Sequence, residues 1–318
     1  MIRFWFNITL LIACVLISVA QPQESDTWHQ RQSGAFLSDC CFDGSKFVVV
    51  GDSGTIQNSS DGTNWITHKL GNNFFFHAVA YGNGKYVAVG GEQVISAGQL
   101  SSWKGVVFAS ADADQWNRIS EPMAYVLFGI CFGDGEFVAV GAEGIGLKSK
   151  DGYQWKTIGS GGDDYLYGAA YGDGKLVVVG GEMAKIVTFA NGAVVKSQLI
   201  RGASKLRRVI YANNRFIAVG GALKADLLTS ADGVEWLPQK SSGALGPLTA
   251  IAFGNGRFVA VGHSGTMLSS PDATTWTPQA PKMTHNNLYG ICFGDRRFLA
   301  VGSGPMILES EPLRIPAK

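Results

Sequence analysis

The hydrophobic pattern of this chain repeats along almost its whole length. In Leu248–Trp276, LTAIAFGNGRFVAVGHSGTMLSSPDATTW, an apolar run leads into a Gly-Asn-Gly-Arg turn, and two further apolar runs lead into a Ser-Pro-Asp turn that ends at tryptophan. Asn or Asp beside Gly supplies the positive φ that a tight hairpin needs. The unit therefore predicts short antiparallel strands. Because apolar residues fill these runs without alternation, we expect both faces of the strands to be covered.

Three aligned columns give the number of copies. An aromatic residue precedes the first turn of each copy, at Phe42, Tyr81, Phe132, Tyr171, Tyr211, Phe253 and Phe293. Large apolar residues lie five positions earlier, at Leu37, Phe76, Leu127, Leu166, Leu206, Leu248 and Leu288, and five positions later, at Phe47, Tyr86, Phe137, Leu176, Phe216, Phe258 and Phe298. A period near 40 residues with four short strands is typical of propeller blades. The sequence therefore predicts an all-β fold, a seven-bladed β-propeller of four-stranded antiparallel blades.

The two ends of the repeat complement each other. Residues 26–32 read as a fourth strand with no first three strands before it, and the seventh copy ends at Ser310 without the tryptophan that closes other copies. Two prolines in the tail also disfavour a central strand there. We expect residues 26–32 to complete the last blade by pairing with Met306–Ser310, because a shared blade removes an open sheet edge.

The most specific motif is the turn between the third and fourth strands. It reads Ser-x-Asp-Gly-x-x-Trp in Ser59–Trp65, Ser149–Trp155 and Ser230–Trp236, with Ala in place of Gly in Ser110–Trp116 and Ser270–Trp276. Ser and Asp side chains can accept backbone N–H groups across such a turn. The motif resembles the Asp-box (BNR) turn of sialidase-like propellers, with one residue fewer between Ser and Trp, over about residues 28–310.

This resemblance implies that the turns are structural and lie on the face away from the ligand site. It does not imply sialidase activity, because the three-arginine carboxylate site and the tyrosine–acid pair of that family cannot be assembled from this chain. More loosely, the regular blades are similar to Asp-box propellers of the non-catalytic type that act as assembly factors, such as those serving photosystem II.

Composition narrows the class of partner. The net charge is +1 and only 16% of the residues are charged, without a basic stripe or an acidic tail. This excludes the electrostatic footprint of a nucleic-acid-binding protein. No group of residues has metal-ligand spacing, so we expect no metal and no cofactor.

The first twenty residues form a separate segment. Residues 4–20 are largely apolar after a basic start, and Ser18–Ala20 is a small-x-small cleavage sequence. This layout predicts a secretory signal peptide at residues 1–20, with the propeller at residues 21–318 and a secreted or periplasmic location. Two alternatives remain open, a bacterial lipoprotein lipidated at Cys14 and a retained membrane anchor, although the apolar run is shorter than a span of about 20 residues.

Four cysteines follow this segment. Cys41, Cys131 and Cys292 share one column with alanine and isoleucine in the other copies, so they are expected to pack as small apolar residues with free thiols. Cys40 beside Cys41 leaves a vicinal disulfide open as a minor alternative.

The ligand site is expected on the face where the inner strands begin. There one column varies while its neighbours are nearly uniform, and it reads Ser38, His77, Phe128, Tyr167, Arg207, Thr249 and Tyr289. The next column adds Asp39 and Arg208 among glycines and alanines. Packing does not dictate a residue that varies, so the column is interpreted as a ligand mouth. The alternative is that these side chains fill wedges of different width between blades.

In the functional interpretation, each residue type has a different role in binding. Phe128, Tyr167 and Tyr289 offer stacking surfaces, and His77 adds an imidazole. Arg207 and Arg208 would form an anion clamp beside the carboxylate of Asp39.

An insertion in the second copy adds a further candidate. It covers about residues 92–105, contains Trp103, and is expected to form a loop on the mouth face. It is interpreted either as a contact arm with Trp103 as its anchor or as a tolerated surface insertion whose tryptophan covers the rim.

Two functions follow from this pattern. The preferred hypothesis is an exported, non-enzymatic, monomeric propeller that binds a protein partner or a glycan through the mouth and has no membrane span after signal cleavage. The alternative is a glycan-active hydrolase or lyase that uses carboxylates at the same mouth, drawn from Asp39, Glu143 and Glu182.

Overall fold

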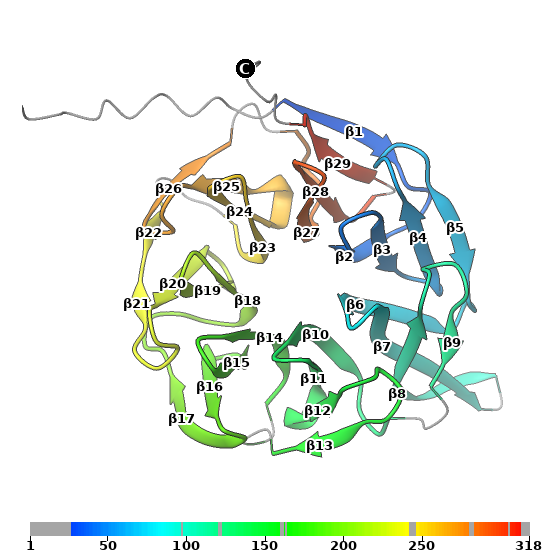
Figure 1. Ribbon diagram of the computed structural model, residues 1–318, viewed down its shortest axis with the longest axis horizontal. Coiled ribbons are helices and arrows are strands. Elements are labelled where there is room, and N and C mark those ends of the chain that lie inside the picture. Colours follow the sequence, from blue (N-terminus) through cyan, green and yellow to red (C-terminus); the bar gives the residue numbers. More distant parts are fainter. Residues whose placement is uncertain are drawn as a thin grey trace, which may run out of the picture.

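The chain forms a closed ring of seven β-sheets (Figure 1). The computed structural model describes residues 27–312 except 97, 120–122, 160–161, 163, 242–245, 280–282 and 305. The predicted signal peptide and Cys14 lie outside the described residues. The predicted all-β, seven-bladed, antiparallel architecture is confirmed.

Each blade runs from an inner strand at the centre of the ring to an outer strand at the rim (Figure 1). Blade 1 contains β2 (Leu37–Phe42), β3 (Phe47–Gly51), β4 (Thr55–Ser59) and β5 (Ile66–Lys69). Blade 2 contains β6 (Phe74–Gly82), β7 (Lys85–Ser96), β8 (Gln99–Ser110) and β9 (Asn117–Arg118). Blade 3 contains β10 (Leu127–Gly133), β11 (Glu136–Gly141), β12 (Gly146–Ser149) and β13 (Lys156–Ile158). Blade 4 contains β14 (Leu166–Gly172), β15 (Lys175–Gly180), β16 (Lys185–Ala190) and β17 (Ala193–Leu199).

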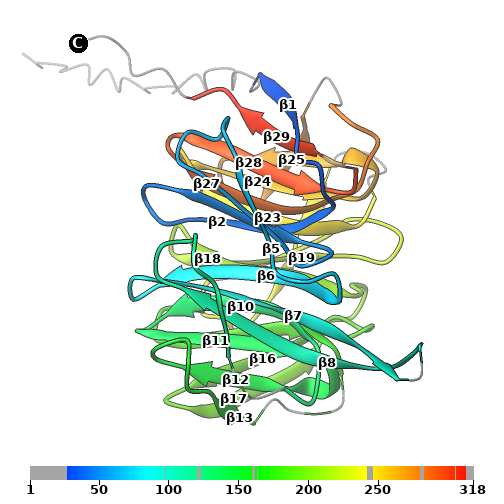
Figure 2. The ribbon, with the colours of Figure 1, turned by 90° about the vertical axis from the view of Figure 1, so that its right-hand side faces the viewer.

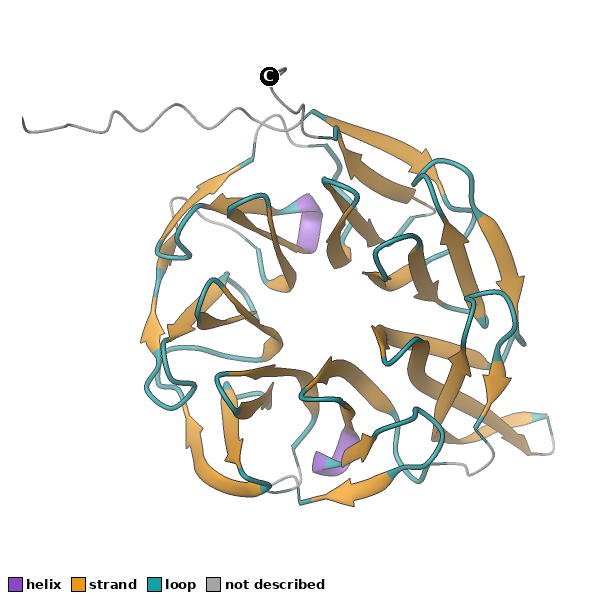
Figure 3. Cartoon of the chain, in the orientation of Figure 1, coloured by secondary structure: helices purple, strands orange, loops and turns teal. Residues whose placement is uncertain are grey.

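The remaining blades follow the same order. Blade 5 contains β18 (Leu206–Ala212), β19 (Arg215–Gly220), β20 (Asp226–Ser230) and β21 (Leu237–Pro238). Blade 6 contains β23 (Leu248–Gly254), β24 (Arg257–Gly262), β25 (Met267–Ser270) and β26 (Thr275–Pro278), with β22 (Lys240–Ser241) parallel to β26. Blade 7 contains β27 (Leu288–Gly294), β28 (Arg297–Gly302), β29 (Met306–Ser310) and β1 (Trp28–Gln32). Short 3-10 turns, η1 (Ala142–Gly144) and η2 (His263–Gly265), join the second and third strands of blades 3 and 6 (Figure 3).

The core lies between neighbouring blades, which explains the uniform columns of the sequence. Side chains from one inner sheet pack against those of the next in seven clusters around the ring. The column that follows the first turn is fully buried at Phe47, Tyr86, Phe137, Phe216, Phe258 and Phe298. Close approach also requires small residues: a Cβ on Gly294 would lie 2.2 Å from the ring of Phe42 in the next blade.

The Ser-x-Asp turns have one shared hydrogen-bond pattern. In blade 1, Ser59 Oγ accepts the N–H of Gly62, and Asp61 Oδ1 accepts the N–H groups of Thr63 and Asn64. Trp65 donates from Nε1 to the Gly62 carbonyl at 3.0 Å. The four other predicted turns repeat the Asp and Trp hydrogen bonds. These bonds hold the pKa of each turn aspartate below its usual range, and the turns lie on the face opposite the starts of the inner strands.

The predicted closure of the ring is confirmed. β1 pairs antiparallel with β29, from Trp28 opposite Ser310 to Gln32 opposite Met306. Glu309 is 3% exposed and lies between two guanidinium groups, Arg31 at 2.8 Å and Arg297. Within the described part of the chain, no helix has the length and apolar character needed to cross a membrane.

Candidate functional site

The mouth of the propeller is built from seven β-bulges. Every inner strand slips by one residue against its neighbour just after it begins. The extra residues are Ser38, His77, Phe128, Tyr167, Arg207, Thr249 and Tyr289, which is the variable column of the sequence. A bulged residue leaves the ladder and its side chain is redirected. This explains why the column can vary: a bulged residue lies outside the regular pairing of the strands.

Four of these residues form a continuous arc over blades 2 to 5. The ring centroids of His77 and Phe128 are 5.3 Å apart, and those of Phe128 and Tyr167 are 5.4 Å apart. The guanidinium carbon of Arg207 lies 5.8 Å from the centroid of the Tyr167 ring. Tyr165, which is 47% exposed, extends the arc outward at 5.8 Å from Phe128. The structure therefore brings four predicted site residues into one stacked surface, the blade 2–5 arc.

Tyr289 belongs to a second, smaller group. Its ring lies 5.2 Å from Phe36 in the loop before blade 1 and 6.4 Å from His263 in η2. Sequence analysis missed Phe36, Tyr165 and His263. Phe36 and Tyr165 occupy the column directly before the aligned Leu37 and Leu166, so extending the comparison by one position finds them. His263 lies in a turn between strands, where the copies differ.

Arg207 is a cation at the mouth for which the described residues supply no carboxylate partner. Burial lowers the pKa of His77 to about 4, and burial together with Arg207 lowers the pKa of His263, so both imidazoles are neutral at pH 7. Lys205 pairs with Glu182 at 2.8 Å. By contrast, the Nε of Arg207 is buried without a hydrogen-bond acceptor among the described residues. The remaining N–H groups of this guanidinium can donate hydrogen bonds to an acidic group of a ligand.

Asp39 and Arg208 do not join this surface. They extend from the residue after the bulge into the central channel, a cavity of about 270 Å³ lined by inner strands of all seven blades. There Arg208 Nη2 donates to Asp39 Oδ1 at 2.8 Å, from blade 5 to blade 1 across the ring. The predicted Arg207–Arg208 clamp is therefore wrong: one guanidinium lies at the mouth and the other is neutralised below it.

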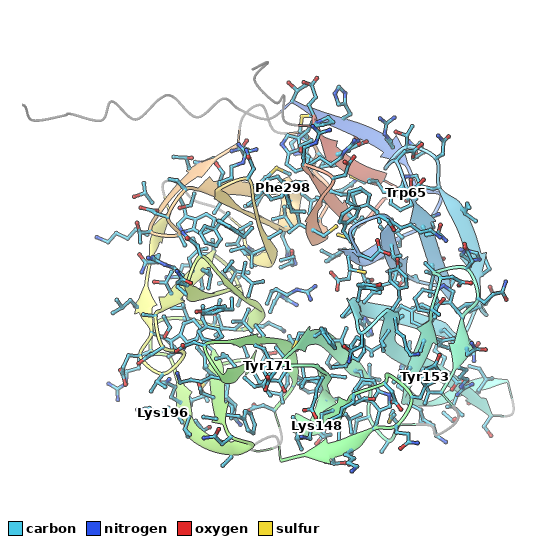
Figure 4. All side chains as sticks on the ribbon, in the orientation of Figure 1. Trp65, Lys148, Tyr153, Tyr171, Lys196 and Phe298 are labelled. Atoms are coloured by element: carbon cyan, nitrogen blue, oxygen red, sulfur yellow. The ribbon has the colours of Figure 1, made fainter. Side chains whose placement is uncertain are left out.

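The buried environment of this ion pair fits a structural role. The Asp39 side chain is 5% exposed and that of Arg208 is 18% exposed. Asp39 also accepts the N–H of Val79 in blade 2 at 3.2 Å. Burial raises the pKa of Asp39, and Arg208 opposes this effect. The pair thus links three blades across the channel. In Figure 4, Tyr171 of the inner strand β14 lies nearer the centre of the ring than Lys196 of the outer strand β17.

The insertion in blade 2 is a β-hairpin, not the predicted loop. β7 and β8 continue their pairing past the blade, with Glu92 opposite Lys104 and Ile95 opposite Leu100. This arm projects from the ring (Figures 1 and 2). Trp103 is 39% exposed and packs edge-on against Phe75 at 5.2 Å. The ladder of the arm contains one register shift, between Val94 and Ile95, where β8 has one extra residue.

The carboxylates proposed for hydrolysis do not form a pair at the mouth. Asp39 is engaged by Arg208 and Glu182 by Lys205. Glu143 lies in the 3-10 turn η1 of blade 3. Across the described ranges, no three His, Cys, Asp or Glu side chains are grouped so that they could hold a metal ion.

Comparisons with known proteins support the architecture. No family model matches the chain, and no curated protein matches it. The solved structure of YCF48 bound to D1 peptide is similar over 93% of this chain and 98% of its own, with a TM-score of 0.69 and 16% identity. YCF48 from Cyanidioschyzon merolae covers 91% and 99%, with a TM-score of 0.66 and 15% identity. Virginiamycin B lyase from Staphylococcus aureus covers 90% and 99%, with a TM-score of 0.76 and 10% identity. At these identities the likeness shows the shared fold, a seven-bladed β-propeller.

Proposed function

We propose that this chain is a binding propeller that recognises a segment of a protein partner at its mouth and performs no catalysis. The observation that carries this proposal is the blade 2–5 arc, in which His77, Phe128, Tyr167 and Arg207 stack in sequence at the bulges. Aromatic and arginine side chains are the residue types that contribute most to protein interfaces.

The distribution of exposed apolar side chains supports the same face. The loops that surround the mouth carry Phe36, Tyr125, Tyr165, Met183 and Leu223, which are 36–93% exposed. The arm adds Ile95, Leu100 and Trp103 at 39–55%. Exposed apolar side chains that lie together are typical of an interaction site. Others, such as Ile66 and Leu237, lie on outer strands at the rim. Trp103 of the arm packs against Phe75, which lies two residues before His77 on β6, so a partner seated at the mouth could also contact Trp103.

The charge at the mouth indicates the chemistry of the partner. Both histidines are neutral at pH 7, and Arg207 has no carboxylate partner among the residues that the structure describes. Its guanidinium would therefore favour a carboxylate next to an apolar or aromatic group that stacks on Phe128 and Tyr167. A peptide segment supplies both groups. The solved YCF48 propeller with a bound D1 peptide is a precedent for peptide binding on this fold.

The enzymatic alternative has less support at this mouth. A glycoside hydrolase needs two carboxyl groups that flank the bond, one of them with a raised pKa. Here burial raises the pKa of Asp39, but this residue lies in the channel and contacts Arg208. Fold similarity to virginiamycin B lyase does not transfer an activity.

The proposal includes three further points. The Ser-x-Asp turns are Asp-box turns with a structural role, in line with their internal hydrogen bonds. The chain is exported by the signal sequence at residues 1–20, as the layout of that segment indicates. It acts as a monomer.

The test is a parallel screen of the purified chain against a random 12-residue peptide array, a glycan array and fluorogenic glycosides. We expect selected peptides to be rich in acidic residues beside apolar ones. Arg207→Ala and Phe128→Ala should each weaken peptide binding by about tenfold or more in calorimetry.

Arg215→Ala provides a matched control, because Arg215 lies in the same blade but at the first turn, on the opposite face. It should leave the Kd unchanged. Turnover of a glycoside, glycan binding without peptide binding, or equal losses from Arg207→Ala and Arg215→Ala would each overturn the proposal.

A further inference from the structure

The seams between blades have a repeated pattern of facing residues. In each inner strand, the residue before the turn aromatic faces the next blade, and the residue before that faces the previous blade. The facing pairs are Cys41 with Val79, Ala80 with Ile130, Cys131 with Ala169, Ala170 with Val209, Ile210 with Ile251, Ala252 with Ile291, and Cys292 with Cys40. Six seams place at least one aliphatic residue at this point. The seam between blade 7 and blade 1 places two cysteines there.

These two thiols lie together in the core cluster between blades 7 and 1. Each affects the pKa of the other, in addition to the effect of burial. Cys40 Sγ also lies 3.4 Å from the carbonyl oxygen of Leu299. The backbones approach closely beside them, since a Cβ on Gly290 would lie 2.7 Å from the Cα of Asp39.

We propose that Cys40 and Cys292 are a cross-linking site, which forms a disulfide between the first and last blades under oxidising conditions. The co-reactant is a low-molecular-weight disulfide of the glutathione type. The thiolate of one cysteine attacks it, forming a mixed disulfide and releasing one glutathione thiol. The second cysteine thiolate then displaces the other glutathione. Two protein thiols are oxidised to one S–S bond, one glutathione disulfide is reduced to two thiols, and the two protons pass to these thiols.

The location of the pair gives the link a function. The pair lies between blade 1 and blade 7, the blade that β1 completes at the rim, so the disulfide would join the first and last blades at the channel in addition to the β1–β29 pairing at the periphery. The closed loop contains about 250 residues, and long loops gain most from a cross-link in the chain-entropy description. Burial raises the pKa of both thiols, so thiolate is scarce in the closed ring and the link should form mainly as the ring closes during folding.

The experiment uses the full chain with Cys14→Ser, unfolded and reduced, then refolded in a buffer of reduced and oxidised glutathione. Intact mass should fall by about 2 Da, two thiols should remain titratable in denaturant, and digestion should yield a peptide pair joined through Cys40 and Cys292. The melting temperature of the oxidised chain should exceed that of the reduced chain by on the order of 10 °C.

The repeats supply variants that should fold. Cys292→Ala introduces the residue that blades 2, 4 and 6 carry in this column, and Cys40→Val introduces the residue of blades 2 and 5. Either variant should abolish the mass loss and the temperature difference, whereas Cys131→Ala should retain both. An oxidised chain with four free thiols, a Cys40–Cys41 link, or a Cys292→Ala variant that still loses 2 Da would each overturn the proposal.

Discussion

Trp28 allows the closure of the ring to be measured with a single side chain. It is the first residue of β1, is 5% exposed, and packs in the cluster that contains Phe298, Met306 and Leu308. The turn tryptophans, such as Trp155, donate from Nε1 to a carbonyl within their own turn. The Nε1 of Trp28 is buried without an acceptor among the described residues. The favourable part of its contribution to stability is therefore apolar burial.

The expected magnitudes follow from this difference. Trp28→Ala removes a buried indole and should lower the free energy of unfolding by about 3–5 kcal/mol. For a chain of this size about 2 °C of melting temperature is lost per kcal/mol, so the melt should fall by about 6–10 °C. Trp28→Phe keeps most of the burial and loses no hydrogen bond, so it should cost less than about 1.5 kcal/mol. Trp155→Phe should cost about 1 kcal/mol more than Trp28→Phe, because it leaves the Gly152 carbonyl without its donor.

The assay is urea and thermal unfolding followed by circular dichroism. Gln30→Ala is the control, since Gln30 lies on the same strand with its side chain exposed. If Trp28→Ala unfolds at the same temperature as Gln30→Ala, blade 7 is stable without β1 and the closure argument is refuted. If Trp28→Phe costs as much as Trp28→Ala, the loss comes from the indole N–H and the burial argument is wrong.

Two further predictions concern the mouth and the channel. The pKa of His77 is about 4 in the folded chain and about 6.5 when unfolded. The stability that the neutral imidazole contributes is therefore present above pH 6.5 and is lost as the pH falls toward 4. Between pH 7 and pH 5 the free energy of unfolding should fall by about 2 kcal/mol. His77→Phe, which introduces the residue of blade 3, should remove this loss in urea titrations, and an unchanged pH dependence would contradict the pKa assignment. For the channel pair, Asp39→Ala alone leaves the Arg208 charge buried and should cost about 3–5 kcal/mol. Arg208→Ala added to it should recover part of that cost because other blades have Ala or Gly at these positions; additive losses in a double-mutant cycle would show that the two side chains do not interact.

The repeated part of the fold could be predicted because one packing problem recurs at every seam. Phe47 and its counterparts fill the same buried place in each blade, so the same kind of residue appears at the same spacing. Closure by β1 was also predictable, because the chain begins with a single extra strand and ends with a copy that lacks one. Pairing the two is the arrangement that leaves no open sheet edge. The arm was predictable in position but not in form, because the insertion carries no turn motif that marks a hairpin.

The parts that sequence reasoning missed depend on contacts between distant positions. Asp39 and Arg208 are 169 residues apart, and no spacing rule states that blades 1 and 5 meet across the channel. Adjacent residues of one strand also differ in direction, which separates Arg208 from Arg207. The facing of Cys40 and Cys292 has the same origin, since it appears only when the last blade is placed beside the first.

The bulges explain how one repeated motif can present a specific surface. Each bulged residue leaves the ladder, so its identity can change without disturbing the strands on either side. Thr249 shows the opposite use of the position: it is 7% exposed, and its hydroxyl lies 3.0 Å from the Val261 carbonyl and 2.6 Å from that of Leu288. Ser38 is likewise small. These two residues separate Tyr289 from the two ends of the blade 2–5 arc. The large side chains of blades 2 to 5 therefore form one uninterrupted surface. A ligand that lay along this surface would contact four blades in succession and end at the guanidinium of Arg207.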